Sequence, residues 1–399
     1  MKARHCVRSP GLLLAAATAA LVAPAAVSGQ SLLSGYGFGA PLEALDARAL
    51  ALGGIGMGLT GTELSPHDPA AAADLAIPAI LFTTQTSWND VQEGGQTSDF
   101  TSTRFPSIGI MYPLNRVGTV SLAFTGVMDQ TWNVSQERLL TLEGSGTQAR
   151  VTDLFESEGG ISALRLGVAR RLSPRLAVGA NVGTYMGTVT RRFTRSFDSL
   201  EVETSVPDYQ IGGLWEYSGF VASLGATLEL GEVARVSGSY SLGGDLKAEP
   251  SDDTEGGGLT VNMPSEIRAG ASALLSEELN LSAGVVYADW TDAGAGIPEV
   301  QGTSVLRLGG GVEWTGASLL GKPSSIRLGY RRGDLPFRRA GDPEVSESVF
   351  SGGIGMNLLQ SGELLLARAD FVVERGNRDA GVFIEEFWRF GLTLRVSGF

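Results

Sequence analysis

Residues Ser325–Arg331 read SIRLGYR, and they alternate strictly between two kinds of side chain. Ile326, Leu328 and Tyr330 are apolar, while serine, arginine and glycine fill the positions between and around them. Successive side chains of a β-strand point to opposite faces, so a period of two gives one apolar and one polar face. The stretch therefore predicts a strand that separates an apolar from a polar environment.

The same alternation recurs along most of the chain. It is clear in residues 220–229, 235–242, 266–273 and 304–314. From Pro78 onward about fourteen such segments can be counted, an even number as bacterial barrels require. Their expected starts lie near residues 79, 105, 117, 160, 175, 208, 233, 264, 278, 303, 324, 347, 363 and 382.

The connections between these segments distinguish a membrane barrel from a soluble β-sandwich. Tight turns, such as Leu172-Ser173-Pro174, alternate with long, acidic, glycine-rich loops, such as residues 135–158 and 246–262. Outer-membrane barrels have short periplasmic turns and longer external loops, whereas the turns of a sandwich are more evenly short. We therefore expect an all-β fold: a transmembrane antiparallel β-barrel of about 14 strands over residues 78–399, in contact with outer-membrane lipid.

A secretory signal peptide is expected over residues 1–29. Lys2, Arg4 and Arg8 precede an apolar run at residues 11–22, and small residues follow it. The alternative is an anchor helix, but the run is shorter than the roughly 20 residues that a span needs. The single cysteine, Cys6, precedes the run, so the exported chain has no disulfide framework.

The formal net charge is −13, and it becomes more negative without the basic signal region. This balance argues against nucleic acid as a partner.

Residues 30–77 lie between the signal and the barrel and are rich in glycine and alanine. Gly53 and Gly54 begin a glycine series that permits close approach of the backbone to other elements. Asp68-Pro69 favours the start of a short helix that continues through Ala70 to Ala73, because aspartate caps helices and proline suits the first position. We expect this segment to fold into the barrel as a hatch.

Two stretches resemble the FadL family of outer-membrane transporters for long-chain fatty acids and other hydrophobic compounds. ARALALGGIGMGLTGTELSPHDPAAAADL, residues 47–75, is similar to the family's N-terminal signature, and residues 263–290 are similar to a family hairpin. The matching positions of the first stretch are Arg48, Gly53, Gly54, Pro69 and Ala70, with Asp68 in place of the usual asparagine.

This resemblance implies an N-terminal hatch, a ligand pocket above it and an inward kink in the third strand that opens a lateral path to the membrane. In this sequence Gly126 interrupts the alternation of the third strand and is the expected position of the kink. The alternative is that Gly126 is one of the many ordinary glycines of the barrel. The implied ligand is a hydrophobic small molecule such as a fatty acid, and the implied location is the outer membrane of a Gram-negative-type bacterium.

The last strand, WRFGLTLRVSGF, resembles the C-terminal signal read by the barrel-assembly machinery, which is the partner expected during biogenesis. Phe399 departs from the parity of the other apolar residues, and a bulge at Gly398 would restore it.

Catalysis is not expected. Only His67 remains after the signal peptide, and it is interpreted as a turn or cap residue; no metal site and no cofactor are expected. Arginines on the polar face raise a different idea, because a cation in a partly apolar lumen could hold a carboxylate. Arg268, Arg307 and Arg327 are the candidate anchors. The alternative is that the lumen arginines pair with Glu266, Glu313 and Asp370 and brace the barrel.

Three functions therefore stay open: a FadL-like channel for hydrophobic molecules, a related barrel that serves secretion or surface assembly in the manner of PorV-like proteins, and a general porin. An N-terminal hatch argues against the porin.

Overall fold

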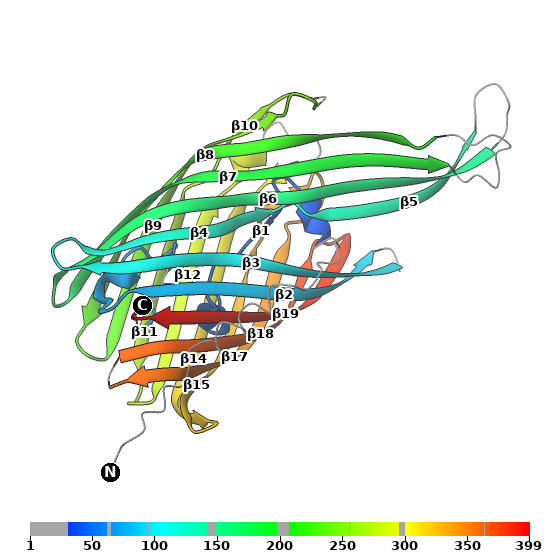
Figure 1. The fold of residues 1–399 in the computed structure, drawn as a ribbon. Helices are drawn as coiled ribbons and strands as arrows, with labels where there is room; N and C mark the ends of the chain where they lie inside the picture. Colours follow the sequence, from blue (N-terminus) through cyan, green and yellow to red (C-terminus); the bar gives the residue numbers. More distant parts are fainter. Residues whose placement is uncertain are drawn as a thin grey trace, which may run out of the picture.

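The computed structural model is a closed antiparallel barrel with its N-terminal segment packed inside (Figure 1). It describes residues 31–61, 65–93, 96–141, 148–197, 207–254, 256–294, 300–362 and 364–399. The strands of the wall are β2 (Ala79–Glu93), β3 (Gln96–Leu114), β4 (Gly118–Asp129), β5 (Trp132–Thr141), β6 (Gln148–Ser173), β7 (Leu176–Phe197), β8 (Tyr209–Leu230), β9 (Ala234–Pro250), β10 (Leu259–Asn262), β11 (Glu266–Leu274), β12 (Leu279–Asp289), β14 (Ser304–Leu319), β15 (Lys322–Asp334), β17 (Ser346–Ser361), β18 (Leu364–Asp379) and β19 (Phe383–Ser397).

These elements form 14 barrel strands, as predicted. β4 and β5 pair with successive parts of β6, and β11 and β10 with successive parts of β9, so each couple is one interrupted barrel strand. β19 pairs with β2 from Phe383↔Glu93 to Ser397↔Ala79 and closes the sheet. Closure pairs the backbone of every strand in lipid, where an unpaired polar group is costly.

The two faces of the wall follow the alternation of the sequence. In β15 the side chains of Ile326 and Leu328 are 43% and 62% exposed, whereas Arg327 is 1% exposed. Apolar residues therefore face lipid, and the charged residues face the lumen. No helix in the described part of the chain is long and apolar enough to cross a membrane, a finding that does not concern β-barrels.

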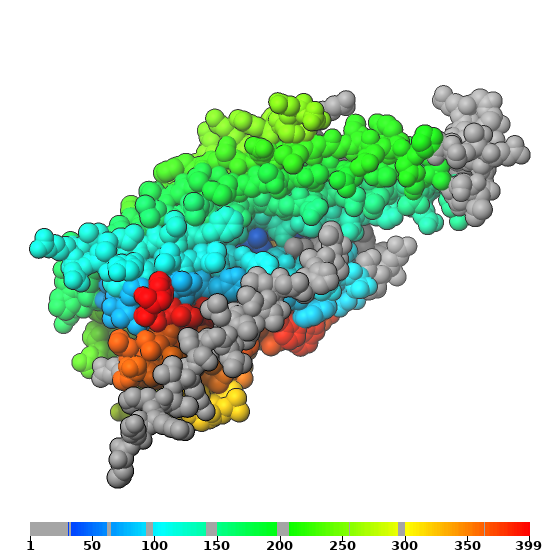
Figure 2. Space-filling model, viewed as in Figure 1, coloured from blue at the N-terminus to red at the C-terminus, as the bar shows by residue number. Residues whose placement is uncertain are grey.

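Two strands are longer than the sequence predicted, and one strand was not expected. β3 begins at Gln96 rather than near 105, and β6 begins at Gln148 rather than near 160. The unexpected strand, β5, overlaps the start of the expected 135–158 loop. The outer parts of β5, β6, β7 and β8 together form a projection (Figures 1 and 2) that we call the blade, residues 132–141, 148–159, 189–197 and 209–215. Polar residues dominate its outer face, so these segments resembled loops in the sequence.

The N-terminal segment crosses the lumen in short pieces. They are η1 (Leu32–Gly35), β1 (Ala40–Pro41), α2 (Ala47–Ala51) and η2 (Ala71–Asp74). The expected helix after Asp68-Pro69 is a 3-10 turn that begins only at Ala71. The α-helix lies earlier: the Asp46 carboxylate accepts a hydrogen bond from the Ala49 amide at 2.7 Å and caps it.

Glycines on both sides allow the backbone of this segment to lie directly on the wall. Gly53 has φ +89, and a Cβ there would lie 2.4 Å from the amide nitrogen of Gly310 on β14. On the other side of the lumen, a Cβ at Gly179 would lie 2.1 Å from the carbonyl oxygen of Pro69. Larger residues at these positions would hold the segment away from the wall.

Smaller elements complete the external end. η3 (Thr291–Gly294) follows β12, and β13 (Val300–Gly302) pairs with β16 (Phe337–Arg339) outside the main sheet. At the opposite end the chain turns at Gly398, which has φ +78 and donates its amide to the Pro78 carbonyl at 2.8 Å.

Candidate functional site

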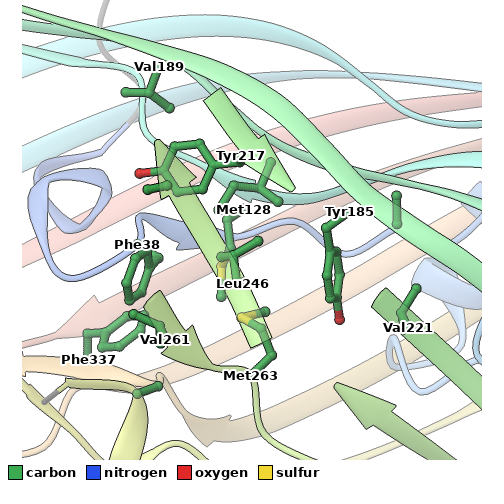
Figure 3. Packing of buried hydrophobic residues seen from close by; sticks show 14 residues of the cluster. Phe38, Met128, Tyr185, Val189, Tyr217, Val221, Leu246, Val261, Met263 and Phe337 are labelled. Carbon is green, nitrogen blue, oxygen red and sulfur yellow. The ribbon is translucent and has the colours of Figure 1, made fainter. Parts of the chain in front are cut away.

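A cavity of about 120 Å³ lies between the N-terminal segment and the wall. Leu42 and Pro66 of the segment line one side, and Met128, Met263 and Trp290 contribute to the other. Figure 3 shows the apolar cluster around it, in which Phe38 packs on Phe337 with ring centroids 6.1 Å apart. Most of the lining is therefore apolar.

Charged side chains converge on the same cavity. Glu43 and His67 approach from the N-terminal segment, and Arg165, Arg268 and Arg307 approach from the wall. Burial alone would raise the pKa of the Glu43 carboxyl, but Arg307 and the other nearby guanidinium groups hold it below its ordinary value. Glu43 is thus an anion at neutral pH and is ion-paired with Arg307.

The three predicted anchor arginines all have protein carboxylates beside them. Arg268 contacts Glu266 at 2.6 Å, and Arg307 contacts Glu43. Arg327 binds both Glu313 and Asp370 at 2.7 Å and does not line the cavity. This arrangement favours the bracing role for Arg327 in particular.

Arg165 is different: it is one of the lumen-facing arginines expected from the alternation, but it is not among the three predicted anchors. Its guanidinium donates to the Thr125 hydroxyl, while its Nε has no hydrogen-bond partner among the described residues. No carboxylate of the described chain lies within 4.0 Å of it. Arg165 is therefore the cavity-lining arginine whose charge the described protein groups leave least compensated.

The predicted hatch residues Arg48 and Asp68 make specific contacts, the first with the wall and the second within the segment. Arg48 binds the Glu313 carboxylate through Nε at 3.0 Å and Nη2 at 2.6 Å, and Glu313 is shared with Arg327. Asp68 is buried and accepts the Ala70 amide at 3.3 Å, so aspartate supplies the acceptor at the position where the FadL signature has asparagine. Ala70 is 2% exposed.

A second buried ion network went unnoticed in the sequence. Arg331 pairs with Glu347 and Glu374, and Arg378 pairs with Glu347 and Glu385. All five are buried at lumen-facing positions, so the alternation within each strand was the available signal. The network fills the lumen on the side of β15–β19.

The ladder between β3 and β4 ends beside the cavity. Its last pair is Ser107↔Thr125, and β1 then pairs with Met128 and Asp129 in place of β3. Gly126 lies at this point: the β4–β6 register shifts between Gly126 and Met128, and a Cβ on Gly126 would lie 2.7 Å from Leu42 Cδ1. The Arg104–Asp129 ion pair, at 2.9 Å, bridges the separated strands.

Replacing Arg48 by alanine should loosen the N-terminal segment without unfolding the barrel. Arg48 is 6% exposed, and its loss removes a bidentate ion pair while Arg327 still compensates Glu313. Amide hydrogens of α2 should exchange roughly 30-fold faster, equivalent to about 2 kcal/mol. Arg116→Ala, in an exposed turn, is the control, and unchanged exchange in Arg48→Ala would show that the pair does not hold the segment.

The segment should also loosen in acid through His67. Burial lowers the pKa of its imidazole below the ordinary 6.5, and the charge of Arg268 lowers it further. A depressed histidine pKa makes the folded state bind fewer protons, so the stabilisation is complete above pH of about 6.5, begins to be lost below that value and is gone once the pH has fallen through the lower pKa of the folded state. Labelling of Ala73→Cys, divided by the rate of an unstructured cysteine peptide at each pH to remove the change in thiolate fraction, should accelerate below pH 6.5, and His67→Gln should remove this dependence. An identical pH profile in both proteins would contradict the assignment.

Several solved structures share the fold. A FadL homologue from Pseudomonas aeruginosa has a TM-score of 0.59 at 12% identity, and the match covers 91% of this chain and 99% of the other. The P. putida toluene transporter TodX gives 0.58 at 12% identity with the same coverage. The CymD monoaromatic hydrocarbon channel gives 0.51 at 14%, covering 92% of this chain and 99% of that one.

The FadL-like fold is thereby confirmed, and the chain is a barrel of the outer membrane of a Gram-negative-type bacterium. No curated protein matches it in sequence. The sequence model of the BamG family matches residues 10–240, which is more than half of the chain. The chain belongs to the BamG family.

Proposed function

We propose that this protein is a channel through which hydrophobic small molecules cross the outer membrane passively. The observation that carries the proposal is the largely apolar cavity, which lies between a plugging segment and the wall and borders the end of the β3–β4 ladder. A pocket with an apolar lining and a few convergent polar groups is the usual form of a small-molecule site. The solved structures of similar fold, named as a toluene transporter and a monoaromatic hydrocarbon channel, support the same class of substrate.

In this proposal residues 30–77 act as the hatch and residues 78–399 as the conduit, after removal of residues 1–29. Gly126 permits the backbone irregularity of β4, where Leu42 packs against it. A molecule in the cavity would leave sideways between β3 and β4 if Leu42 and the Arg104–Asp129 pair moved aside. The hatch residues Arg48 and Asp68 keep the axial route filled.

Long-chain fatty acids are the finer proposal for the substrate, and Arg165 is the group best placed to select them. A carboxylate in the cavity could bind the guanidinium of Arg165 without displacing a protein carboxylate. Arg268 and Arg307 also line the cavity, but each would have to give up Glu266 or Glu43 to bind a ligand carboxylate.

A role in secretion or surface assembly is the second candidate, and the blade favours it. The blade leaves a long strand edge without a neighbour among the described residues, which a channel does not need. The two functions differ in what they require: the channel needs the cavity, and the assembly role needs a protein partner at the blade. An open porin has less support, because the hatch and two ion networks fill the lumen.

Replacing Arg165 by alanine should weaken binding of a long-chain fatty acid about tenfold, since a charge-assisted hydrogen bond is lost in a partly buried site. Binding of the methyl ester should be unchanged, because the ester carries no charge. Tryptophan fluorescence of the detergent-solubilised protein would follow binding through Trp290, which lines the cavity. Arg116→Ala, in an exposed turn outside the cavity, is the control, and an equal loss for acid and ester would contradict the anchor role.

A further inference from the structure

One face of the blade carries a row of apolar and aromatic side chains across its four strands. The strand ladders place Val134, Phe155, Phe193 and Ile211 in one row across β5, β6, β7 and β8. The rings of Phe155 and Phe193 are 4.8 Å apart, and Tyr209 approaches Phe193 at 6.3 Å. This face continues the lumen face of the barrel, because Val189 and Tyr185 share the parity of Phe193 on β7.

The opposite face shows that the blade stands outside the membrane. On β6 the lipid-facing residues Leu164, Leu166 and Val168 are apolar, but farther along the same face lie Thr152, Glu156 and Glu158. Glutamates on a lipid-facing surface would be costly, so the hydrocarbon ends before this point. The apolar face is therefore in water, and its side chains are not covered by the protein: Val134, Phe155, Ile211 and Tyr209 are 38–54% exposed.

One edge of the blade is open along β5. β5 pairs with β6 from Trp132↔Ser157 to Thr141↔Gln148, and the ladder between β3 and β4 has already ended at Ser107↔Thr125. β1 covers the preceding residues Met128 and Asp129 only. From 133 to 141, no strand in the described part of the chain pairs with the other edge of β5. Proteins protect such edges or use them to bind another strand, and β5 contains no proline.

The blade's apolar face also carries uncompensated positive charge. Arg138 and Arg195 both contact Asp153, which is completely buried between them. Arg191 donates to the Gln130 side chain at 3.0 Å and lies 5.9 Å from the ring centre of Trp215. Among the described residues of the blade, this face thus carries three guanidinium groups and one carboxylate, in a chain whose net charge is −13.

We propose that the open edge of β5 binds an extended segment of a partner protein, which adds a strand to the blade. On the face shared with Val134 and Arg138, this segment would present apolar side chains beside Val134 and carboxylates beside Arg138. The unpaired backbone of β5 indicates a polypeptide partner, because only another strand can pair its amide and carbonyl groups in register. The excess of arginine on this face favours an acidic segment.

Synthetic nonapeptides provide a direct test with the detergent-solubilised full chain. The acidic probes carry two valines and two glutamates at alternate positions, in either order, with serine and threonine between them. One control has lysines for the glutamates, and another has every backbone amide of the acidic peptide N-methylated. Fluorescence anisotropy measures affinity, and hydrogen exchange locates the site.

The acidic peptide should bind about tenfold more tightly than the lysine peptide, which places like charges beside the arginines. N-methylation should abolish binding, and the peptide should slow amide exchange in residues 132–141 but not in β18. Equal affinities of the acidic and lysine peptides, retained binding after N-methylation, or protection confined to another region would each overturn the proposal.

Arg138→Gln should weaken the acidic peptide about threefold, because this arginine is only partly buried. Arg192→Gln is the matched control, since Arg192 lies on the polar face of the same blade beside Glu156. Equal effects of both variants would contradict a specific site. Native mass spectrometry tests whether a second copy of this chain occupies the edge instead. A dimer that dissociates in Arg138→Gln would assign the edge to that second copy and overturn the proposal of an acidic partner.

Discussion

The structure depends on one constraint: in lipid, every backbone amide and carbonyl must be paired within the protein. The pairing of β19 with β2 satisfies it by closing the sheet. Closure sends every second side chain into the lumen, where the charged residues of β14 to β19 must find partners away from bulk water. The hatch and the ion networks around Arg327 and Arg331 are consequences of that requirement.

The same constraint explains where the barrel is irregular. The hydrogen-bonded ladder between β3 and β4 ends beside the lumen cavity. There β1 replaces β3 as the neighbour of β4 for two residues. Beyond it β5 has an edge without a described neighbour, which is tolerated because the blade lies outside the hydrocarbon region. The proposed ligand path and the proposed protein-binding edge thus both arise where β3 separates from the strand formed by β4 and β5. The ligand path lies near Gly126, and the protein-binding edge lies beyond Trp132.

The sequence was informative wherever lipid imposes an alternation. Residues 325–331 predicted both faces of β15, and most strand starts lie within two residues of their expected positions. It failed for the blade, because Thr152 and Glu156 occupy a face that no longer meets lipid. It also missed the contact between Arg48 and Glu313, which are 265 residues apart, and the lack of a protein ion pair at Arg165. Both depend on three-dimensional packing that no local pattern encodes.

The most direct measurement of the central claim is uptake of a labelled long-chain fatty acid, and of toluene in parallel, by cells with and without this protein. A variant lacking residues 30–75 would be compared at equal abundance in the outer membrane. The account predicts that uptake of at least one hydrophobic compound falls without the protein, returns on complementation and changes when the hatch is removed. Unchanged uptake of both compounds, with the protein present and folded in the outer membrane, would contradict the channel and leave the blade as the functional part.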